Sequence, residues 1–202
     1  MKFFSLISIP ILSLEICCLL LTLCFIYNFN KKLVIQKNAT TQETITQQIV
    51  NKPTSIGPPI SLTIPTINVH ANIQNLGVTS GGDMEVPSNI VDVGWFKFGS
   101  RPGEKGSAVI VGHFDGENGK GIFANLNKLK KGDELYVEDS NGTSFVFVVR
   151  ESHIYDPGYK EDVFSLNDSV HLNLITCDGV WDKNKKRYNK RLVVFTDLKT
   201  NI

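Results

Sequence analysis

The sequence has a single cysteine outside its hydrophobic N-terminal region, and its surroundings favour a nucleophile. Cys177 ends the largely apolar run of residues 172–176 and is followed directly by Asp178 and Gly179. Because an Asp-Gly pair favours a turn, we expect a strand to end here and to present the thiol at its exposed end. A lone cysteine is more often an inert buried residue. The position at a strand end favours instead a cysteine that attacks a carbonyl carbon.

His113 occupies a comparable place. It follows the apolar residues 108–111 and Gly112, whose small size permits close approach. Histidine is the side chain best suited to move protons near neutral pH, so His113 is the candidate proton carrier. The alternative is a structural histidine bonded to the backbone. Asp115 could orient the ring of His113, although it more readily begins the turn of residues 115–119.

The other three histidines serve as comparisons. His70 lies in an early predicted strand, and His153 lies in a predicted connection. His171 precedes Cys177 on the same predicted strand, so it faces the same side but lies about 20 Å away. That distance excludes direct proton transfer to Cys177, and we expect all three histidines to be dispensable for catalysis.

An arginine supplies the third chemical group. Arg191 opens the predicted last strand, and its guanidinium stays charged at any relevant pH while presenting several donors to a carbonyl oxygen. The rival is Arg187, within the cationic run of residues 183–187, but such a run is usually a solvated loop. A residue at a strand end is held more rigidly than one on a loop, so Arg191 is the favoured oxyanion donor.

Short apolar segments punctuated by Gly, Asp, Asn and Pro predict the strands that must hold these three residues. Only residues 122–129 have helical spacing, with Ile122, Phe123, Leu126 and Leu129 on one face. The predicted class is mainly β, closed or nearly so, with short helices in the connections. The predicted strands are residues 60–64, 67–73, 107–111, 134–137, 144–150, 170–177 and 191–197.

Composition limits the classes of partner and cofactor. The 202 residues are 20% charged and 42% hydrophobic, which suits one globular domain with an appendage. Lys and Arg total 21 against 20 Asp and Glu, so no excess of positive charge argues for a nucleic acid. No second cysteine accompanies Cys177 at zinc-ligand spacing, no Gly-rich phosphate loop occurs, and residues 115–119 are a weak calcium signal. We predict neither a cofactor nor a metal.

Residues 3–29 form a nearly uninterrupted apolar stretch, long enough to cross a hydrocarbon core of about 30 Å as a helix. No small-x-small pair suggests cleavage, so a retained anchor is favoured over a removed signal peptide. Its three cysteines are interpreted as small apolar filler, with acylation as the lesser alternative. Lysines on both sides leave its orientation open. The predicted organisation is an anchor at 1–29, a flexible spacer at 30–59 and a catalytic domain at 60–202.

Together these residues resemble the pattern of sortases, which are membrane-anchored cysteine transpeptidases of mainly Gram-positive bacteria. Asn-Leu-Ile-Thr-Cys at residues 173–177 resembles the sortase signature Thr-Leu-x-Thr-Cys, and His113 and Arg191 match the family's histidine and arginine. Asn173 departs from the first Thr of the signature, which bears on the subclass. The resemblance covers residues 60–198. The runs most similar to class F, with class D or E as alternatives, are residues 84–87, 93–96, 101–104 and 106–115.

The resemblance implies an eight-stranded sortase β-barrel whose groove holds His113, Cys177 and Arg191 and receives a sorting peptide of the Leu-Pro-x-Thr-Gly type. Cys177 would attack the Thr carbonyl, Arg191 would hold the oxyanion, and His113 would protonate the leaving amine. An amine acceptor, either a cell-wall precursor or a pilin lysine, would resolve the thioester. Such an enzyme works outside the cell, so we expect a single membrane span, an inside N-terminus and an extracellular catalytic domain that anchors surface proteins.

Two alternatives come from other classes of protein. An L,D-transpeptidase also uses a cysteine and a histidine in a β-rich exported domain, but its Ser-His-Gly-Cys type of motif is absent around Cys177. A catalytically silent, membrane-tethered peptide-binding module would keep the barrel and the groove without needing the three residues. Labelling of Cys177 by a thiol probe, prevented by a sorting peptide, would support an active groove.

Overall fold

The computed structural model describes residues 28–32, 55–117, 119–158, 160–166 and 168–200. Contacts divide the chain into two units, Met1–Thr54 and Ser55–Ile202. In the first unit, residues 28–32 are described and are helical. No helix within the described ranges is long and apolar enough to cross a membrane. Residues 1–27 of the predicted anchor and residues 33–54 of the predicted spacer lie outside the described residues.

Hydrogen bonds tie the start of the second unit to its barrel. The backbone N–H of Gly57 donates to the Asp139 carboxylate over 2.8 Å. The side-chain amide of Asn141 donates to the carbonyl of Ser55 over 2.6 Å. The barrel unit therefore begins a few residues before residue 60, the predicted start of the catalytic domain.

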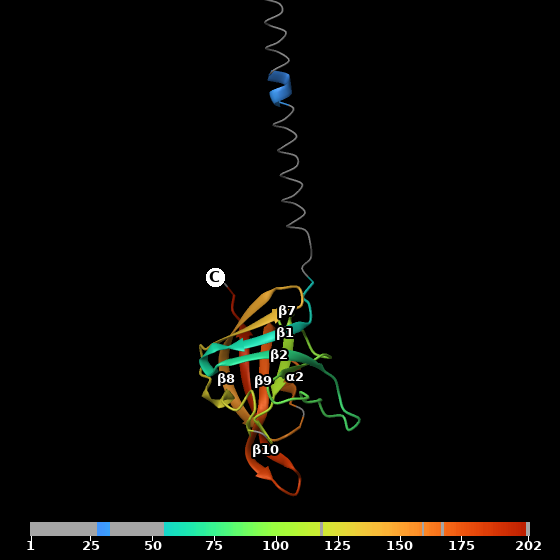
Figure 1. The fold of residues 1–202 in the computed structure, drawn as a ribbon, viewed down its shortest axis with the longest axis vertical. Coiled ribbons are helices and arrows are strands. Elements are labelled where there is room, and N and C mark those ends of the chain that lie inside the picture. The colour runs from blue at the N-terminus through green and yellow to red at the C-terminus, as the bar shows by residue number, and fades with distance from the viewer. Residues whose placement is uncertain (1–27, 33–54, 118, 159, 167, 201–202) are drawn as a thin grey trace, which may run out of the picture. The chain divides into compact units, whose positions relative to one another are not determined.

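Eight strands close into a barrel. Figure 1 labels β1, β2, β7, β8, β9 and β10 of this barrel. Their order around the barrel is β1 (Pro59–Ile64), β2 (Val69–Leu76), β3 (Val93–Phe96), β4 (Gly106–Gly112), β9 (Val170–Asp182), β10 (Arg187–Leu198), β8 (Ser144–Tyr155) and β7 (Glu134–Asp139). The β2–β3 and β4–β9 pairs are parallel and the others antiparallel. The remaining elements are the β5–β6 hairpin (Asp115–Gly116 and Gly119–Lys120), η1 (Pro65–Ile67), η2 (Leu126–Lys128) and α2 (Glu161–Phe164). The predicted eight-stranded, mainly β barrel with short helices is confirmed.

Alternating side chains make one part of the barrel wall apolar on both faces. Inside the barrel, even-numbered residues of β4, β9 and β10 form part of the main core, and Ile110, Leu174 and Val194 are fully buried there. Successive side chains on a strand point to opposite faces, so the odd-numbered residues of these strands point outward. Among them, Val109, Val193 and Phe195 form a second buried cluster with Val163 of α2. A strand covered on both sides carries such a continuous apolar run.

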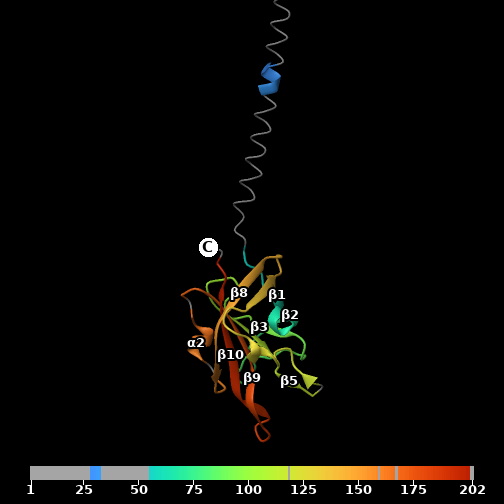
Figure 2. The same cartoon turned by 90° about the vertical axis from the view of Figure 1, so that its left-hand side faces the viewer.

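The connection between β8 and β9 covers this outer cluster, and Figure 2 shows α2 on the outside of the wall. Two side chains from the wall hold the connection. Asn173 Nδ2 on β9 donates to the Val163 carbonyl over 2.6 Å, and Ser107 Oγ on β4 donates to the Leu166 carbonyl over 3.1 Å. The connection therefore packs on the barrel as part of the domain.

The predicted helix at residues 122–129 is wrong. The segment forms turns followed by the short 3-10 helix η2, although Phe123, Leu126 and Leu129 are buried as the pattern predicted. The N–H of Phe123 donates to the carbonyl of His113, and the N–H of Leu126 donates to the carbonyl of Phe123. A hydrogen bond to the segment of His113 and three-residue turns therefore take the place of the hydrogen bonds of an α-helix.

Candidate active site

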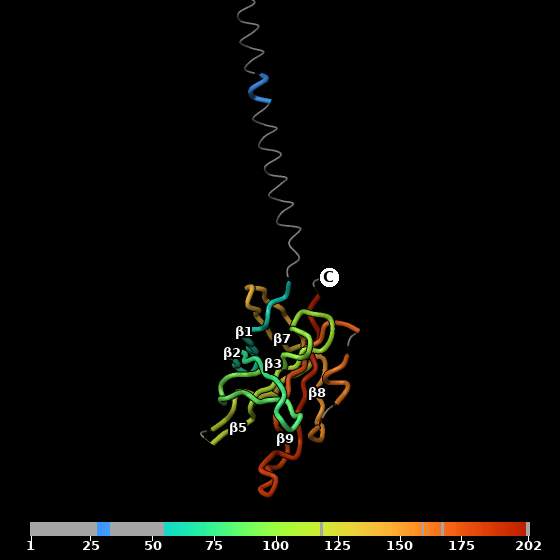
Figure 3. The backbone as a smooth tube through the Cα atoms, turned by 90° about the vertical axis from the view of Figure 1, so that its right-hand side faces the viewer, coloured from blue at the N-terminus to red at the C-terminus, as the bar shows by residue number. Residues whose placement is uncertain are grey.

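Cys177 lies within a strand rather than at its end, which corrects the predicted strand boundary. Beyond the barrel, β9 and β10 continue as a hairpin that extends past the end opposite the C-terminus (Figures 1 and 3). Gly179 has a positive φ of 82°, and the side chain of Asn189 accepts a hydrogen bond from the Val180 N–H over 2.8 Å. The register shifts here, so two residues of β9 oppose one residue of β10. The Asp-Gly pair, predicted as a turn, therefore forms part of a β-bulge.

Strand register brings the three predicted site residues to one level of the barrel wall. Parallel pairing joins β4 and β9 up to Val111 and Ile175. Thr176 Oγ1 then donates to the Gly112 carbonyl over 2.8 Å, which continues this register past the last pair. The next residues are His113 on the β4 side and Cys177 on β9. Antiparallel pairing places Arg191 of β10 directly opposite Cys177.

The row formed by His113, Cys177 and Arg191 lies beside the outer apolar cluster. Side chains alternate along a strand, so Cys177 points to the same face as Ile175, which packs against that cluster, and Arg191 to the same face as Val193, which belongs to it. Both residues therefore lie on the outer face of the wall. All three residues of the row are half-buried. Partly buried aromatic residues from other elements pack against the same cluster, namely Phe96, Tyr155 and Phe164. A chain bound on this face would meet the row at one end of an apolar surface.

The ring of His113 is held by a backbone carbonyl. His113 Nε2 lies 2.8 Å from the carbonyl oxygen of Pro87, and a carbonyl oxygen only accepts hydrogen bonds. Nε2 therefore carries a hydrogen, and Nδ1 is the nitrogen free to exchange a proton with a substrate group. The tautomer follows from this partner. Pro87 was not predicted as a site residue, because its contribution is a main-chain oxygen that no side-chain pattern reveals.

Burial and two nearby charges change the pKa of the Cys177 thiol in different directions. Cys177 is a free cysteine. Its burial raises the pKa of the thiol above its usual value, the nearby Arg191 guanidinium lowers that pKa, and the Asp115 carboxylate raises it. The resting site thus favours the protonated thiol, and nucleophilic attack requires removal of that proton.

Arg191 is anchored through its own strand. Its Nη1 donates to the carbonyls of Lys190 over 2.8 Å and Tyr188 over 3.1 Å. The sequence predicted that Arg191 opens the last strand. The strand begins at Arg187 instead, so Arg191 lies inside β10. Arg187 is exposed in the hairpin and faces Asp182, away from the row of three residues.

Replacing Arg191 with lysine should lower turnover by about a hundredfold or more, the scale seen when one oxyanion donor is removed. An ammonium lacks the planar set of donors that a guanidinium offers to the oxyanion. The oxyanion forms only during the reaction, so the affinity for the expected sorting peptide should change less than kcat. Arg187→Lys is the matched control and should be close to neutral. Steady-state kinetics of peptide cleavage would measure both variants, and the opposite pattern would assign the oxyanion to Arg187.

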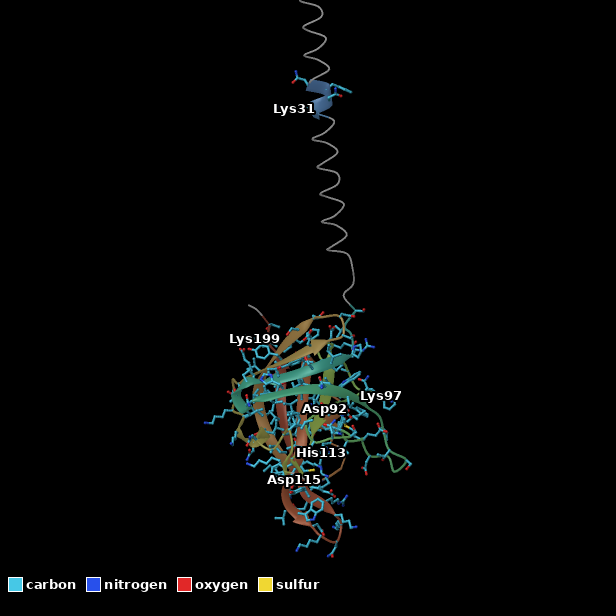
Figure 4. The ribbon with its side chains drawn as sticks, viewed as in Figure 1. Lys31, Asp92, Lys97, His113, Asp115 and Lys199 are labelled. Carbon is cyan, nitrogen blue, oxygen red and sulfur yellow. The ribbon has the colours of Figure 1, made fainter. Side chains whose placement is uncertain are left out.

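Asp115 does not orient the ring of His113, which contacts Pro87 instead. It begins the β5–β6 hairpin, as the turn prediction indicated, and accepts a hydrogen bond from the hydroxyl of Tyr188 on β10. Figure 4 shows His113 and Asp115 near the base of the β9–β10 hairpin. Tyr188 was missed by the sequence analysis, since one tyrosine in a cationic run carries no pattern of its own.

The three comparison histidines occupy other positions in the barrel. His70 is on β2 and pairs with Thr63 of β1. His153 lies in β8, which extends to Tyr155, and not in a connection as predicted. His171 is 5% exposed, and its ring nitrogens lie 2.8 Å from Asp197 and 2.7 Å from Asp168.

His171 therefore has a structural role at the other end of β9. Both of its ring nitrogens lie within hydrogen-bonding distance of carboxylate oxygens, one from Asp168 and one from Asp197. Across the described ranges, no group of three or more His, Cys, Asp and Glu side chains is arranged to hold a metal ion.

Asn173, the residue that departs from the Thr-Leu-x-Thr-Cys signature, is 1% exposed on the outer face of β9. Its amide nitrogen bonds to α2, whereas its Oδ1 has no hydrogen-bond partner among the described residues. An unpaired buried acceptor costs about 1–3 kcal/mol. The gain from Asn173 is therefore the attachment of α2.

A family model described as Sortase domain matches residues 62–199 of the chain. The match covers seven of the barrel strands in full and the second half of β1, and it includes His113, Cys177 and Arg191. A search of curated proteins found no match.

Solved structures of sortases share this fold. Sortase A from Corynebacterium diphtheriae aligns with a TM-score of 0.57 and 22% identity, over 74% of this chain and 64% of that chain. The complex of Streptococcus agalactiae sortase C1 and MTSET aligns with a TM-score of 0.57 and 25% identity, over 71% and 69%. Sortase C-1 from Actinomyces oris aligns with a TM-score of 0.57 and 22% identity, over 77% and 82%. Class F, D or E stays a prediction, and the L,D-transpeptidase alternative gains no support.

Proposed function

Because this chain belongs to the sortase family, we propose that it is a membrane-anchored cysteine transpeptidase that joins surface proteins to an amine of the cell wall or of a pilin. The observation that carries this proposal is the row formed by His113, Cys177 and Arg191 on the outer wall of the barrel. A nucleophile, a proton carrier and a fixed cation are the groups that acyl transfer through a thioester requires.

The first half-reaction cleaves the sorting peptide. Cys177 gives its proton to His113, and its sulfur bonds to the Thr carbonyl carbon of a Leu-Pro-x-Thr-Gly sequence. The carbonyl oxygen becomes an oxyanion, which the guanidinium of Arg191 stabilises. As the bond to the Gly nitrogen breaks, His113 gives a proton to the leaving amine. The products are a thioester on Cys177 and a released C-terminal peptide.

The second half-reaction resolves the thioester. A primary amine attacks the Thr carbonyl carbon, and His113 takes up the proton that this amine loses. The carbon–sulfur bond then breaks as the new amide forms, and the sulfur leaves as a thiolate that takes the proton back from His113. Water resolves the thioester in the same way when no amine arrives, which gives slow hydrolysis.

The location follows from the acceptor. Cell-wall precursors and pilins lie outside the cell, so the catalytic domain must face the outer side of the membrane. The apolar stretch at residues 3–29 supports a single-pass anchor with an inside N-terminus. The polar residues after this stretch would act as a spacer that lets the domain reach its substrates.

Incubating the full-length protein with a Leu-Pro-x-Thr-Gly peptide library and a primary amine tests this function. Mass spectrometry should find peptides cleaved after Thr, with the amine joined to the new carboxyl end and a transient acyl adduct on Cys177. Removal of the amine should leave the hydrolysed product alone. Cleavage at unrelated bonds, or no cleavage of any library member, would count against a sortase activity.

The silent peptide-binding module predicts a different result in the same experiment. Such a module would bind a sorting peptide and protect Cys177 from a thiol-reactive probe, but it would form no acyl adduct. Labelling of Cys177 and detection of the adduct, performed in parallel, therefore separate binding from turnover.

A further inference from the structure

The backbone ladder ends just before the segment that carries His113. Parallel pairing of β4 with β9 stops at Val111 and Ile175, and the Thr176–Gly112 hydrogen bond is the last link of that register. Residues 113–115 lie beyond it. Their position relative to Cys177 must therefore depend on contacts made by side chains or by other loops.

Tyr188 contacts this segment from the β9–β10 hairpin. Its hydroxyl donates to the Asp115 carboxylate, and its ring meets that of Phe114 edge-on with centroids 5.5 Å apart. The ring of Tyr188 also meets the ring of Trp181 edge-on, with centroids 5.3 Å apart. The hydrogen bond to Asp115 raises the pKa of Tyr188 to about 12, so the hydroxyl stays a donor throughout the neutral range.

The same residue contacts the arginine through its backbone. The carbonyl of Tyr188 accepts a hydrogen bond from Arg191 Nη1 over 3.1 Å. Tyr188 thus contacts the segment next to His113 with its side chain and Arg191 with its main chain. Tyr188 therefore links the two sides of the row outside the strand ladder, through its side chain on one side and through its main chain on the other.

We propose that Tyr188 is a positioning residue, which fixes residues 113–115 against the hairpin and thereby holds His113 and Asp115 in place beside Cys177. This inference rests on the proposed function, since its consequence is for acylation of Cys177. Tyr188 acts through Asp115 and Arg191 and does not itself touch the reacting atoms. Misplacement of a catalytic group by about 1 Å can cost on the order of a hundredfold in rate, so this link matters for kcat.

Tyr188→Phe is the main test, because it keeps both ring contacts and removes only the hydroxyl. We expect kcat for peptide cleavage by the full-length protein to fall about tenfold to a hundredfold, with KM changed less than threefold. Asp115→Ala should produce a similar loss, and the double variant should be no slower than Asp115→Ala alone. Residues that act through one hydrogen bond show this lack of additivity.

Tyr136→Phe is the matched control. Its hydroxyl also donates to a carboxylate, that of Glu134, over 2.9 Å, but on β7 and away from the row. This variant should keep the parent kcat. Thermal unfolding of each variant would show that the barrel stays folded. Asp115 is exposed, so its alanine variant supplies the answer if Tyr188→Phe fails to fold.

A second readout needs no substrate. The carboxylate of Asp115 raises the pKa of the Cys177 thiol, opposing Arg191. The rate of alkylation of Cys177 by iodoacetamide, followed against pH by peptide mass spectrometry, should shift its midpoint to lower pH in Asp115→Asn. Tyr188→Phe should shift it in the same direction, because a carboxylate released from the hydroxyl turns toward solvent.

The two readouts keep the inference separate from the proposed function. If the parent protein cleaves no sorting peptide, the function fails, yet the alkylation profiles still report whether Tyr188 holds Asp115 beside Cys177. If the parent is active and Tyr188→Phe retains both the parent kcat and the parent alkylation midpoint, Tyr188 is not a positioning residue.

Discussion

Replacing Cys177 with alanine should abolish both peptide cleavage and formation of the thioester while leaving the barrel folded. The thiol is the bond-forming atom of the proposed reaction, and no neighbouring side chain can take its place. Its side chain lies on the outer face of β9, apart from the core inside the barrel, so its loss removes little packing. Mass spectrometry of the acyl adduct and thermal unfolding would measure the two effects separately.

The three N-terminal cysteines provide the control. Changing all of them to alanine should leave cleavage at the parent rate, since the proposed chemistry uses none of them. Turnover of Cys177→Ala comparable to that of the parent would remove Cys177 as the nucleophile, whatever the outcome of the control.

Replacing His113 with alanine should lower the rate of acylation by about a hundredfold to ten-thousandfold, the usual contribution of a general acid or base. The reaction needs a thiol that has lost its proton and an imidazole that carries one. The rate should therefore rise and then fall with pH, with two apparent pKa values in the parent protein. The pKa of the Cys177 thiol is raised. The part of the pH–rate profile that reports thiol ionisation should therefore lie at higher pH than it would for an ordinary cysteine. Single-turnover acylation across pH would measure both features.

His70→Ala and His153→Ala are the appropriate controls and should keep rates near that of the parent. His171→Ala is less suitable, because the buried ring bonds to Asp168 and Asp197, and its loss should lower thermal stability. If His153 proved indispensable while His113 did not, the proton carrier would have been assigned to the wrong residue.

The structure brings the three residues chosen from local patterns in the sequence to one level of the barrel wall, but not because they lie at strand ends. His113 does follow a strand, as Gly112 indicated, whereas Cys177 and Arg191 lie inside strands that continue into the hairpin. What brings them together is register. Period-two alternation shows which face a side chain occupies but not which residue of another strand lies opposite.

The parts that the sequence analysis missed depend on tertiary contacts. Asp178 and Gly179 suit a turn and a bulge equally well, and only the partner strand decides between them. Residues 122–129 have a helical apolar face, but the carbonyl of His113 takes the N–H of Phe123. β3 was not predicted because it has only four residues and includes Gly94.

The β4–β9 pairing joins residues 64 positions apart, as the Thr176–Gly112 bond shows, and this separation has a consequence for folding. Contacts between distant segments form slowly, because the chain loses conformational entropy before those contacts stabilise it. His113 and Cys177 reach the same level only when this parallel ladder forms. Under the proposed topology, a chain that crosses the membrane unfolded has no transpeptidase activity on arrival, and Cys177 gains its proton carrier and its oxyanion donor only as the barrel closes.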